Sequence, residues 1–342
     1  MKLHKENKSF PSDPYLNVST YIYRNCLKYS DPKSLLGSFL LRIFSRLRSM
    51  LIKSLDPPCK MSIRGKELYM PLSHSLPFYV ASLPHYDMAM SRIGNFVRSK
   101  YGFLKGIDIG ANIGDTISVC YDDESDQFLA IEANPFFFNY LSQNFTGKNV
   151  KMLNVLCSSS ESKKSFKIRA GDGTAIISES HSGVELDEKP LDLIIRGNPE
   201  FMDANFLKVD TDGYDFVILA GAKEFIKSNL PAIFFESYPL NDSYIKSLVE
   251  TLETLRELGY KTALIYDNFG YLFNRLELND LLPLKYPFFW QLTYKQHCFD
   301  ILLMKEDDLA QFLDSELAHF TDTIPDEALK IAAYDLLELK SK

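Results

Sequence analysis

The chain has 342 residues, which is enough for one large domain with appendages or for two modest domains. Apolar residues make up 46% of it and charged residues 24%, as in ordinary globular proteins, and a net charge of −7 argues against nucleic acid as a partner. The charge is uneven, because residues 1–60 hold 11 basic and 4 acidic side chains. A basic N-terminal segment therefore precedes an acidic body.

The five cysteines and six histidines predict neither a metal centre nor a disulfide framework. The cysteines are odd in number, none forms a C-x-x-C pair, and the histidines are scattered. The first residues lack the apolar core of a signal peptide, and no stretch approaches the roughly 18 uncharged apolar residues of a transmembrane helix. We therefore expect a cytoplasmic protein with reduced thiols and no metal.

The first strong element in the chain is a basic amphipathic helix over Lys33–Leu55. Residues 1–14 before it are polar and are expected to be loose. Within the helix, apolar residues recur every three or four positions with arginines among them, and Pro57 follows its end. We expect this helix to pack on its own domain. A partner-subunit contact, or peripheral binding at the inner face of a membrane, is the alternative. The oligomeric state stays open.

Shorter elements follow, and then a long alternation of strands and helices. Met61–Leu83 predicts short strands with a hairpin at Gly65, and Asp87–Ser99 predicts a helix. From Leu104 to Met304, strand and helix patterns alternate, which is typical of a doubly wound α/β sheet. We expect Gly171–Lys189 to be a mobile loop.

The stretch LKGIDIGANIGDT, at Leu104–Thr116, reads as a strand, a tight glycine turn and the start of a helix. The dinucleotide fingerprint G-x-G-x-x-G fails here, because Asn112 and Asp115 stand where two of its glycines belong. The pattern is instead acid-x-Gly-x-x-x-Gly, formed by Asp108, Gly110 and Gly114. Glycines at these positions would let a nucleoside ligand approach the main chain.

Further acidic residues end the neighbouring predicted strands. Glu132 lies about one βαβ unit after Asp108, where a carboxylate can accept both hydroxyls of a ribose. Asp210 and Glu236 end two later strands. In an open α/β sheet such strand ends face one crevice, so we expect the four carboxylates to converge there. That convergence needs cations or hydrogen bonds to offset the charge.

These motifs together resemble the FkbM family of S-adenosylmethionine-dependent methyltransferases. The resemblance rests on IDIGANIGDT, LAIEANP, LKVDTDGYDFVILAGA and IFFESYP, and covers roughly residues 70–304. The third motif is complete as Asp210, Asp212, Gly213, Tyr214 and Asp215, although Asp212 stands where Glu is commoner. The resemblance implies a lead-in or substrate-side cap at 61–100 and a class I methyltransferase domain at 101–304, whose sheet is mostly parallel with an antiparallel last strand. It does not cover the basic helical extension at 1–60 or the acidic helical tail at 305–342, which the charge and residue patterns predict.

The resemblance implies methyl transfer from S-adenosylmethionine to an oxygen, often a sugar or polyketide hydroxyl. The segment PLSHSLPFYVASLPHYD resembles the lead-in of bacterial members linked to surface polysaccharide. Glu132 would hold the ribose, and Cys157 and Ser158 would approach the adenine. The cofactor-binding residues implied in this way are Asp108, Gly110, Ala111, Asn112, Gly114, Thr116, Glu132, Ala133, Asn134, Cys157, Ser158 and Asp210.

The acceptor hydroxyl needs a base, because it is a poor nucleophile until its proton begins to leave. Asp210 is the first candidate, Glu236 the second and His181 the third. The partner would be a small-molecule or glycan acceptor, for whose sugar rings Tyr271, Phe288, Phe289 and Trp290 are candidate stacking residues. Two other readings stay open: an NAD-dependent oxidoreductase, and a degenerate Rossmann scaffold in a glycan-assembly complex.

Overall fold

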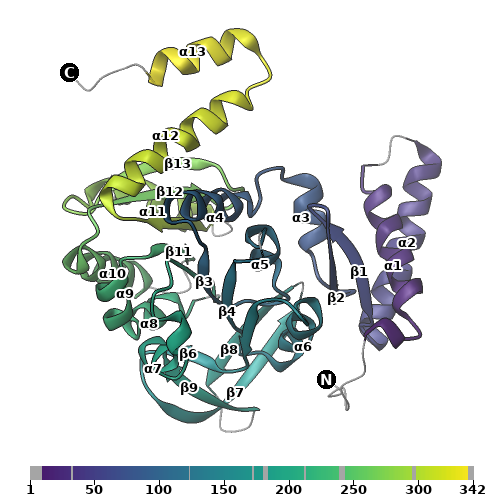
Figure 1. Cartoon of the computed structure of the whole chain (residues 1–342). Coiled ribbons are helices and arrows are strands. Elements are labelled where there is room, and N and C mark those ends of the chain that lie inside the picture. Colours follow the sequence, from purple (N-terminus) through teal and green to yellow (C-terminus); the bar gives the residue numbers. More distant parts are fainter. Residues whose placement is uncertain are drawn as a thin grey trace.

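A central β-sheet places the glycine-rich motif near its middle. The protein is represented by a computed structural model, which describes residues 10–31, 34–122, 124–171, 173–179, 184–211, 213–238, 243–294 and 298–337. In this part of the chain the main sheet has eight strands (Figure 1). In spatial order they are β13 (Leu272–Glu277), β12 (Thr262–Asp267), β14 (Phe299–Leu303), β11 (Ala232–Ser237), β10 (Phe206–Val209), β3 (Lys105–Ile109), β4 (Gln127–Ile131) and β5 (Val150–Leu153).

The sheet is mostly parallel, as the sequence predicts. β5, β4, β3, β10 and β11 run parallel to one another. β14 lies antiparallel between β11 and β12, and β13 pairs antiparallel with β12 at the edge. The predicted doubly wound α/β fold with an antiparallel last strand is confirmed. Five carboxyl ends therefore share one edge of the sheet, where ligands bind in folds of this kind.

Helices bury both faces of the sheet, which is why its strands read as apolar runs. Alternate residues of each strand enter two separate clusters, with Ile107 and Leu207 in one and Phe128 and Phe206 in the other. The first cluster is covered by α7 (Leu191–Arg196), η2 (Pro199–Phe201), α8 (Asp215–Ala220), α9 (Lys223–Asn229), α10 (Tyr244–Leu258), η3 (Leu282–Leu284) and α11 (Lys285–Tyr294). The second is covered by α4 (Met88–Tyr101), α5 (Asp115–Cys120), α6 (Pro135–Asn144) and α12 (Glu306–Asp322).

The N-terminal part forms a further layer that packs against α6 (Figure 1). The predicted helix and the predicted hairpin are confirmed as α2 and as β1 with β2, whereas α1 and α3 were not predicted. Asn144 of α6 joins this layer to the sheet, since it accepts from the Tyr69 amide (2.7 Å) and donates to the Ile113 carbonyl (2.9 Å). The elements are η1 (Phe10–Ser12), α1 (Leu16–Lys28), α2 (Leu35–Ser54), β1 (Pro58–Ile63), β2 (Lys66–Pro71) and α3 (Leu76–Ser82). Residues 1–9 of the segment expected to be loose lie outside the described residues.

A second, four-stranded sheet stands where the sequence predicted a loop. Its spatial order is β6 (Leu156–Ser158), β9 (Val184–Pro190), β7 (Ser162–Gly171) and β8 (Thr174–Glu179). The prediction of a loop over Gly171–Lys189 is wrong, because β8 and β9 lie within this segment. Leu156, Phe166 and Leu186 form the small apolar core of this sheet. The predicted third strand, Val150–Leu156, is also broken into β5 and β6.

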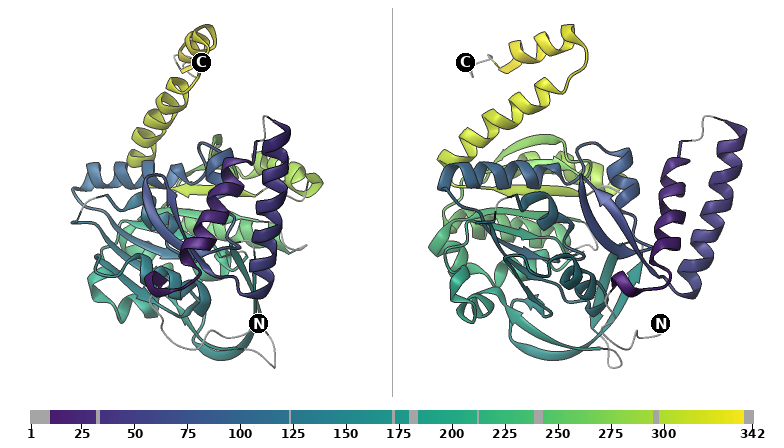
Figure 2. Two further views of the ribbon diagram at one scale, coloured as in Figure 1. Left: turned by 90° about the vertical axis from the view of Figure 1, so that its right-hand side faces the viewer. Right: turned by 45° about the vertical axis from the view of Figure 1, so that its right-hand side comes forward.

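The acidic C-terminal tail is helical, as predicted. Leu309 and Phe312 of α12 enter the core, and Glu316 is buried where it accepts from Arg92 Nη2 (2.9 Å) and from the Tyr266 hydroxyl (3.0 Å). The following helix, α13 (Glu327–Leu337), has no residue that is buried among those described. It projects from the body of the molecule (Figure 2).

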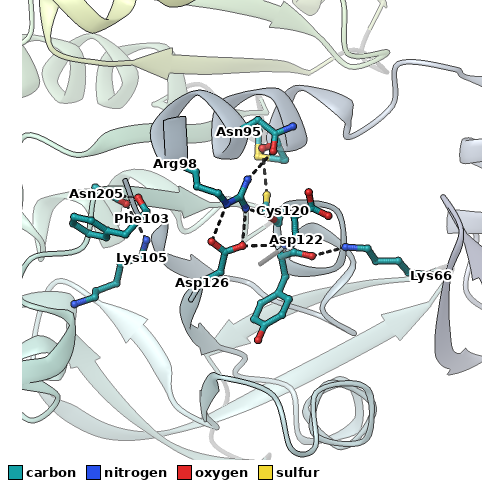
Figure 3. A network of polar contacts seen from close by, with 11 residues as sticks. Lys66, Asn95, Arg98, Phe103, Lys105, Cys120, Asp122, Asp126 and Asn205 are labelled. Atoms are coloured by element: carbon teal, nitrogen blue, oxygen red, sulfur yellow. Dashed lines mark hydrogen bonds and ion pairs between the residues drawn. The ribbon is translucent and has the colours of Figure 1, made fainter. Parts of the chain in front are cut away.

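The amino end of the sheet is fastened by a buried ion pair between Arg98 and Asp126 (Figure 3). Arg98 donates from Nε (2.9 Å) and Nη2 (2.6 Å) to the two carboxylate oxygens of Asp126, and Nη2 also donates to the Cys120 carbonyl (2.7 Å). Asn205 ties the starts of β3 and β10 by accepting from the Lys105 amide (3.0 Å). These contacts fix α4 and α5 to the sheet and leave its carboxyl edge for the site.

Candidate active site

Strand register brings the predicted acidic residues to one edge of the sheet. β10 pairs in register with both β3 and β11, which places Asp210 between Gly110 and Glu236. β4 pairs with the other side of β3, so Glu132 lies beside Gly110. Asp108 lies two residues before Gly110 and is fully buried. Glu132, Asp210 and Glu236 therefore form one row at the edge of the sheet, and Asp108 lies buried beneath it.

A buried lysine, which the sequence analysis missed, lies among these carboxylates. Lys208 of β10 is 5% exposed, and its Nζ is 3.3 Å from Asp108 Oδ1 and 3.3 Å from Asp210 Oδ2. The same atom is 3.4 Å from the Gly110 carbonyl oxygen. A signal was present in the sequence, since a charged residue inside the apolar strand before Asp210 is rarely buried without a partner.

The negative charge around Lys208 exceeds what one ammonium group offsets. Burial would lower the pKa of Lys208, but the surrounding carboxylates raise it well above its ordinary value. Burial raises the pKa of Asp108 to about 6 although Lys208 acts to lower it, and burial together with Asp115 raises the pKa of Asp87 to about 8. The four carboxylates acting on Lys208 are Asp108, Asp210, Asp115 and Asp87. This edge therefore favours a positively charged ligand.

The glycine-rich turn uses its own amides inside the protein. The amides of Gly110 (2.9 Å) and Ala111 (3.1 Å) both donate to the Ile131 carbonyl, and the Gly114 amide donates to the Ala111 carbonyl (2.7 Å). The Asn112 amide donates to a Glu132 carboxylate oxygen (2.8 Å). The amides of these four residues are therefore all used within the protein.

Glu132 is held rigidly at the wall of the site. One carboxylate oxygen accepts from the Asn112 amide and the other from the Asn134 amide (2.7 Å). The side chain is 7% exposed, and burial raises its pKa to about 7 even though both amides act to lower it. Each oxygen keeps a lone pair for a further donor, so this carboxylate can accept from two adjacent hydroxyls.

His74, another residue that the sequence analysis missed, reaches the turn from the N-terminal layer. Its Nδ1 accepts from the Leu76 amide (3.2 Å), which leaves the proton on Nε2. Burial lowers the pKa of His74 to about 4, so the ring is neutral at pH 7. The ring lies against Gly173, whose carbonyl accepts from the Asn112 side chain (2.6 Å). The layer before the sheet thus helps to hold the turn.

An open cavity of about 540 Å³ lies against this edge of the sheet. Of the predicted cofactor-binding residues, those that line it are Gly110, Asn112, Glu132, Ala133, Cys157 and Asp210. Those that do not line it are Asp108, Ala111, Gly114, Thr116, Asn134 and Ser158, and of these all are buried. Apolar and motif residues that the sequence analysis did not assign to the site complete the wall: Ile109, Ile131, Phe137, Val155, Leu156, Thr211, Tyr214 and Ile218.

The third motif arranges the side of the cavity next to β10. Asp215, at the start of α8, accepts from the Thr211 hydroxyl (3.1 Å) and from the Gly213 amide (3.3 Å). Burial raises its pKa to about 7. These contacts hold the turn after Asp210, whose side chain is 50% exposed. Asp212 lies outside the described residues.

Glu236 and His181 are the other two candidate bases. Glu236 is partly buried beside the Cys298 thiol, whose pKa is raised by burial and by the Glu236 charge. His181 lies outside the described residues, so its prediction stays untested. Of the aromatic candidates, Tyr271 (43%) and Phe289 (74%) are exposed and Phe288 is buried, while the side chain of Trp290 is not described.

Among the described residues, no group of three or more His, Cys, Asp or Glu side chains could hold a metal ion. The site offers instead a buried carboxylate on one wall, an apolar wall and a half-exposed carboxylate at the mouth. Asp210, Glu236 and Glu132 lie at the strand ends where the sequence analysis expects them, and their role as a binding site stays a prediction.

Comparison with known proteins finds a family model that matches part of the chain. Residues 108–262 match the family model described as the methyltransferase FkbM domain. No curated protein matches the sequence. A solved methyltransferase FkbM from Methylobacillus flagellatus KT is 17% identical, with a TM-score of 0.34, over 46% of this chain and 39% of its own. A SAM-dependent methyltransferase from Agrobacterium tumefaciens is 10% identical, with a TM-score of 0.42, over 74% of this chain and 72% of its own. The chain thus spans well under half of the Methylobacillus protein.

Proposed function

Since the chain carries a methyltransferase FkbM domain over residues 108–262, we propose that it transfers a methyl group from S-adenosylmethionine to a hydroxyl oxygen. We propose a sugar hydroxyl of a surface polysaccharide or other glycan, or of a secondary metabolite, as the acceptor. The observation that carries this proposal is the excess of carboxylates around Lys208 beside the cavity. A cationic sulfonium with an ammonium group suits that field, whereas a phosphate does not.

The turn around Gly110 also argues against the dinucleotide alternative. A pyrophosphate site needs main-chain amides that point at the ligand. Here the amides of Gly110, Ala111, Asn112 and Gly114 are all used within the protein. The acidic surroundings would in addition repel a phosphate. The oxidoreductase alternative therefore lacks its binding element in this turn.

The residues of the cavity fit S-adenosylmethionine in three parts. Glu132 presents both carboxylate oxygens for the ribose hydroxyls, and Phe137, Leu156 and Ile218 provide an apolar wall for a flat purine. Asp210, together with the buried carboxylates behind it, favours the charged methionine end. When bound, S-adenosylmethionine supplies an electrophilic methyl group on a positively charged sulfur.

Asp210 is placed to receive the acceptor hydroxyl. Its carboxylate lies at the mouth of the cavity and is held on one side by Lys208. The acceptor oxygen would form the new C–O bond while the C–S bond breaks and its electron pair returns to sulfur. The hydroxyl proton would pass to Asp210 as that bond forms. We expect Asp210 both to orient the hydroxyl and to remove its proton.

Replacing Asp210 by asparagine tests this proposal. We expect methyl transfer to fall by about 100-fold or more, the usual scale for a lost base, because an amide cannot take the proton. The assay would measure S-adenosylhomocysteine release with a panel of nucleotide sugars and glycans. The control is Asp314→Asn, at an exposed position on α12. Unchanged turnover in Asp210→Asn would remove this residue from the mechanism, and no release with any hydroxyl acceptor would count against O-methylation.

The pH dependence of donor binding gives a second test. The pKa of Glu132 is about 7 in the protein without ligand, so the side chain becomes protonated as the pH falls below that value. Ribose hydroxyls donate to the ionised form, so we expect the Kd of S-adenosylhomocysteine to rise about tenfold or more from about pH 8 to about pH 5.5. Protonation of Asp215, whose pKa is also about 7, acts in the same direction if it is linked to binding.

The matched variants are Glu132→Gln and, as the control, Glu257→Gln on the exposed side of α10. We expect Glu132→Gln to bind weakly at every pH and to lose most of the pH dependence, and we expect Glu257→Gln to behave like the unaltered protein. Calorimetric titration measures both. A Kd that stays constant over this pH range in the unaltered protein would contradict the ribose assignment, and no binding at any pH would favour the scaffold alternative.

A further inference from the structure

Helix α2 is fastened to the protein along one face only. Arg48 points inward, where Nε donates to the Leu72 carbonyl (3.0 Å) and Nη2 to the Ser73 carbonyl (3.1 Å). Its guanidinium also lies over the ring of Tyr23, with 4.6 Å between the guanidinium carbon and the ring centroid. Phe44 packs against aromatic rings on α1 and just after it. These contacts fix the orientation of the helix and decide which side chains face outward.

The outward face carries a stripe of large apolar side chains. They recur at the three- and four-residue spacing of one helix face, so they lie together on its surface. All of them are exposed, and together they form an apolar patch of the kind that marks an interaction site. The exposed fractions are 67% for Leu36, 59% for Phe39, 37% for Ile43, 41% for Leu47 and 68% for Met50.

Basic side chains border this stripe on one side. Arg42, Arg46 and Lys53 are exposed, and no acidic residue occurs between Asp31 and Asp56. A shallow hollow follows the same side of the helix, lined by Ser45, Arg46, Ser49, Met50 and Lys53. Two hydroxyls and two cations in one hollow can contact a phosphate group. The cationic border distinguishes this surface from α13, whose exposed apolar residues are accompanied by acidic ones.

We propose that the outer face of α2 docks on the surface of a bilayer that contains anionic phospholipid. The apolar stripe would enter the headgroup region while Arg42, Arg46 and Lys53 contact lipid phosphates, as in interfacial amphipathic helices. The helix would lie on the membrane and not cross it, since among the described residues no helix is long and apolar enough to span a bilayer. The helices α1 and α2 form the outer layer on their side of the molecule, so α2 can meet a flat surface (Figure 2). The proposal does not depend on the methyl acceptor.

Co-sedimentation of the full chain with lipid vesicles tests the proposal. Vesicles of phosphatidylglycerol mixed with phosphatidylcholine would be compared with vesicles of phosphatidylcholine alone. We expect binding to the anionic vesicles to be at least about tenfold tighter, because each basic residue near the surface adds an electrostatic attraction. High salt should weaken the binding but leave part of it, since salt screens the charges and not the apolar contact.

Two sets of substitutions separate the two contributions. One set is Arg42→Gln, Arg46→Gln and Lys53→Gln, and the other is Phe39→Ser, Ile43→Ser and Met50→Ser. We expect each set to weaken anionic-vesicle binding by at least about tenfold, while thermal unfolding and S-adenosylhomocysteine binding stay unchanged. Matched controls away from α2 are Lys223→Gln, Lys227→Gln and Lys261→Gln for charge and Leu329→Ser with Ile331→Ser for apolar exposure.

Three results would overturn the proposal. The first is equal binding to both kinds of vesicle, and the second is vesicle binding that neither set of α2 substitutions weakens. The third is that no form of the protein binds vesicles, while light scattering shows a dimer that only the apolar substitutions dissociate. The last result would assign the face to a second copy of this chain. Loss of vesicle binding with intact methyl transfer would leave the proposed function untouched, so the two proposals fail separately.

Discussion

Replacing Lys208 by methionine should destabilise the protein by about 3–5 kcal/mol at neutral pH, the usual cost of removing one partner from a buried ion pair. Methionine keeps the length of the side chain but removes the charge. Asp108, which is fully buried, then loses an ammonium group 3.3 Å away. Asp210 can turn its charge toward solvent, so most of the cost should fall on Asp108. Urea unfolding measures the change.

The loss of stability in Lys208→Met should increase as the pH rises. The pKa of Asp108 is already raised to about 6, and removing Lys208 raises it further. A carboxyl group whose folded-state pKa lies above its unfolded value contributes most stability below the unfolded pKa and loses it as the pH rises through the folded pKa. Lys208→Met should therefore differ least from the unaltered protein at about pH 5 and most at about pH 8.

Two further variants make this test specific to the buried charge. The double variant Lys208→Met with Asp108→Asn should recover much of the lost stability, because the buried negative charge is removed with its partner. Lys105→Met is the matched control, since Lys105 lies on neighbouring β3 and pairs with exposed Asp203 (2.6 Å), a kind of pair worth about 1 kcal/mol or less. If all three variants unfold at the same urea concentration, Lys208 has no such role.

The sequence predicts the row of acidic residues because that row depends on local signals. Each of Glu132, Asp210 and Glu236 follows a short apolar run, and a parallel sheet necessarily brings such ends to one edge. The charge balance could not be predicted in the same way. Lys208 faces Asp108 only because β10 pairs with β3, across about a hundred residues of chain. The pattern of residues identifies a strand, but it does not show which strand will pair with it.

The second sheet and His74 show the other limit of sequence patterns. Glycines and polar residues in Gly171–Lys189 favour a loop, and the pairing of β7 with β8 and β9 cannot be read from this segment alone. His74 lies in a different layer from the turn, and its ring comes to lie against Gly173 only when β1 and β2 pack against α6. The motifs around Gly110, Glu132 and Asp210 could be located from the sequence because they lie on the strand ends themselves.

Replacing Gly110 by alanine should both destabilise the protein and weaken ligand binding. Gly110 has a φ of +79°, and an added Cβ would lie 1.8 Å from the Asp210 carbonyl oxygen. The backbone conformation alone costs about 1–2 kcal/mol for an L side chain. Relief of the clash requires the ends of β3 and β10 to move apart, and overpacking of this kind adds about 1–3 kcal/mol.

Gly102→Ala is the matched control for this variant. Gly102 also has a φ of +79°, but no atom lies within 4 Å of the position of its added Cβ. It should therefore show the conformational cost alone, and the difference between the two variants isolates the contact with Asp210. Because separation of β3 from β10 also moves Asp210 away from Glu132, Gly110→Ala should weaken S-adenosylhomocysteine binding by about tenfold or more, the cost of about 1.4 kcal/mol. Equal unfolding free energies and equal affinities in both variants would mean that these strand ends are not fixed against each other, and that the row of carboxylates is not rigid.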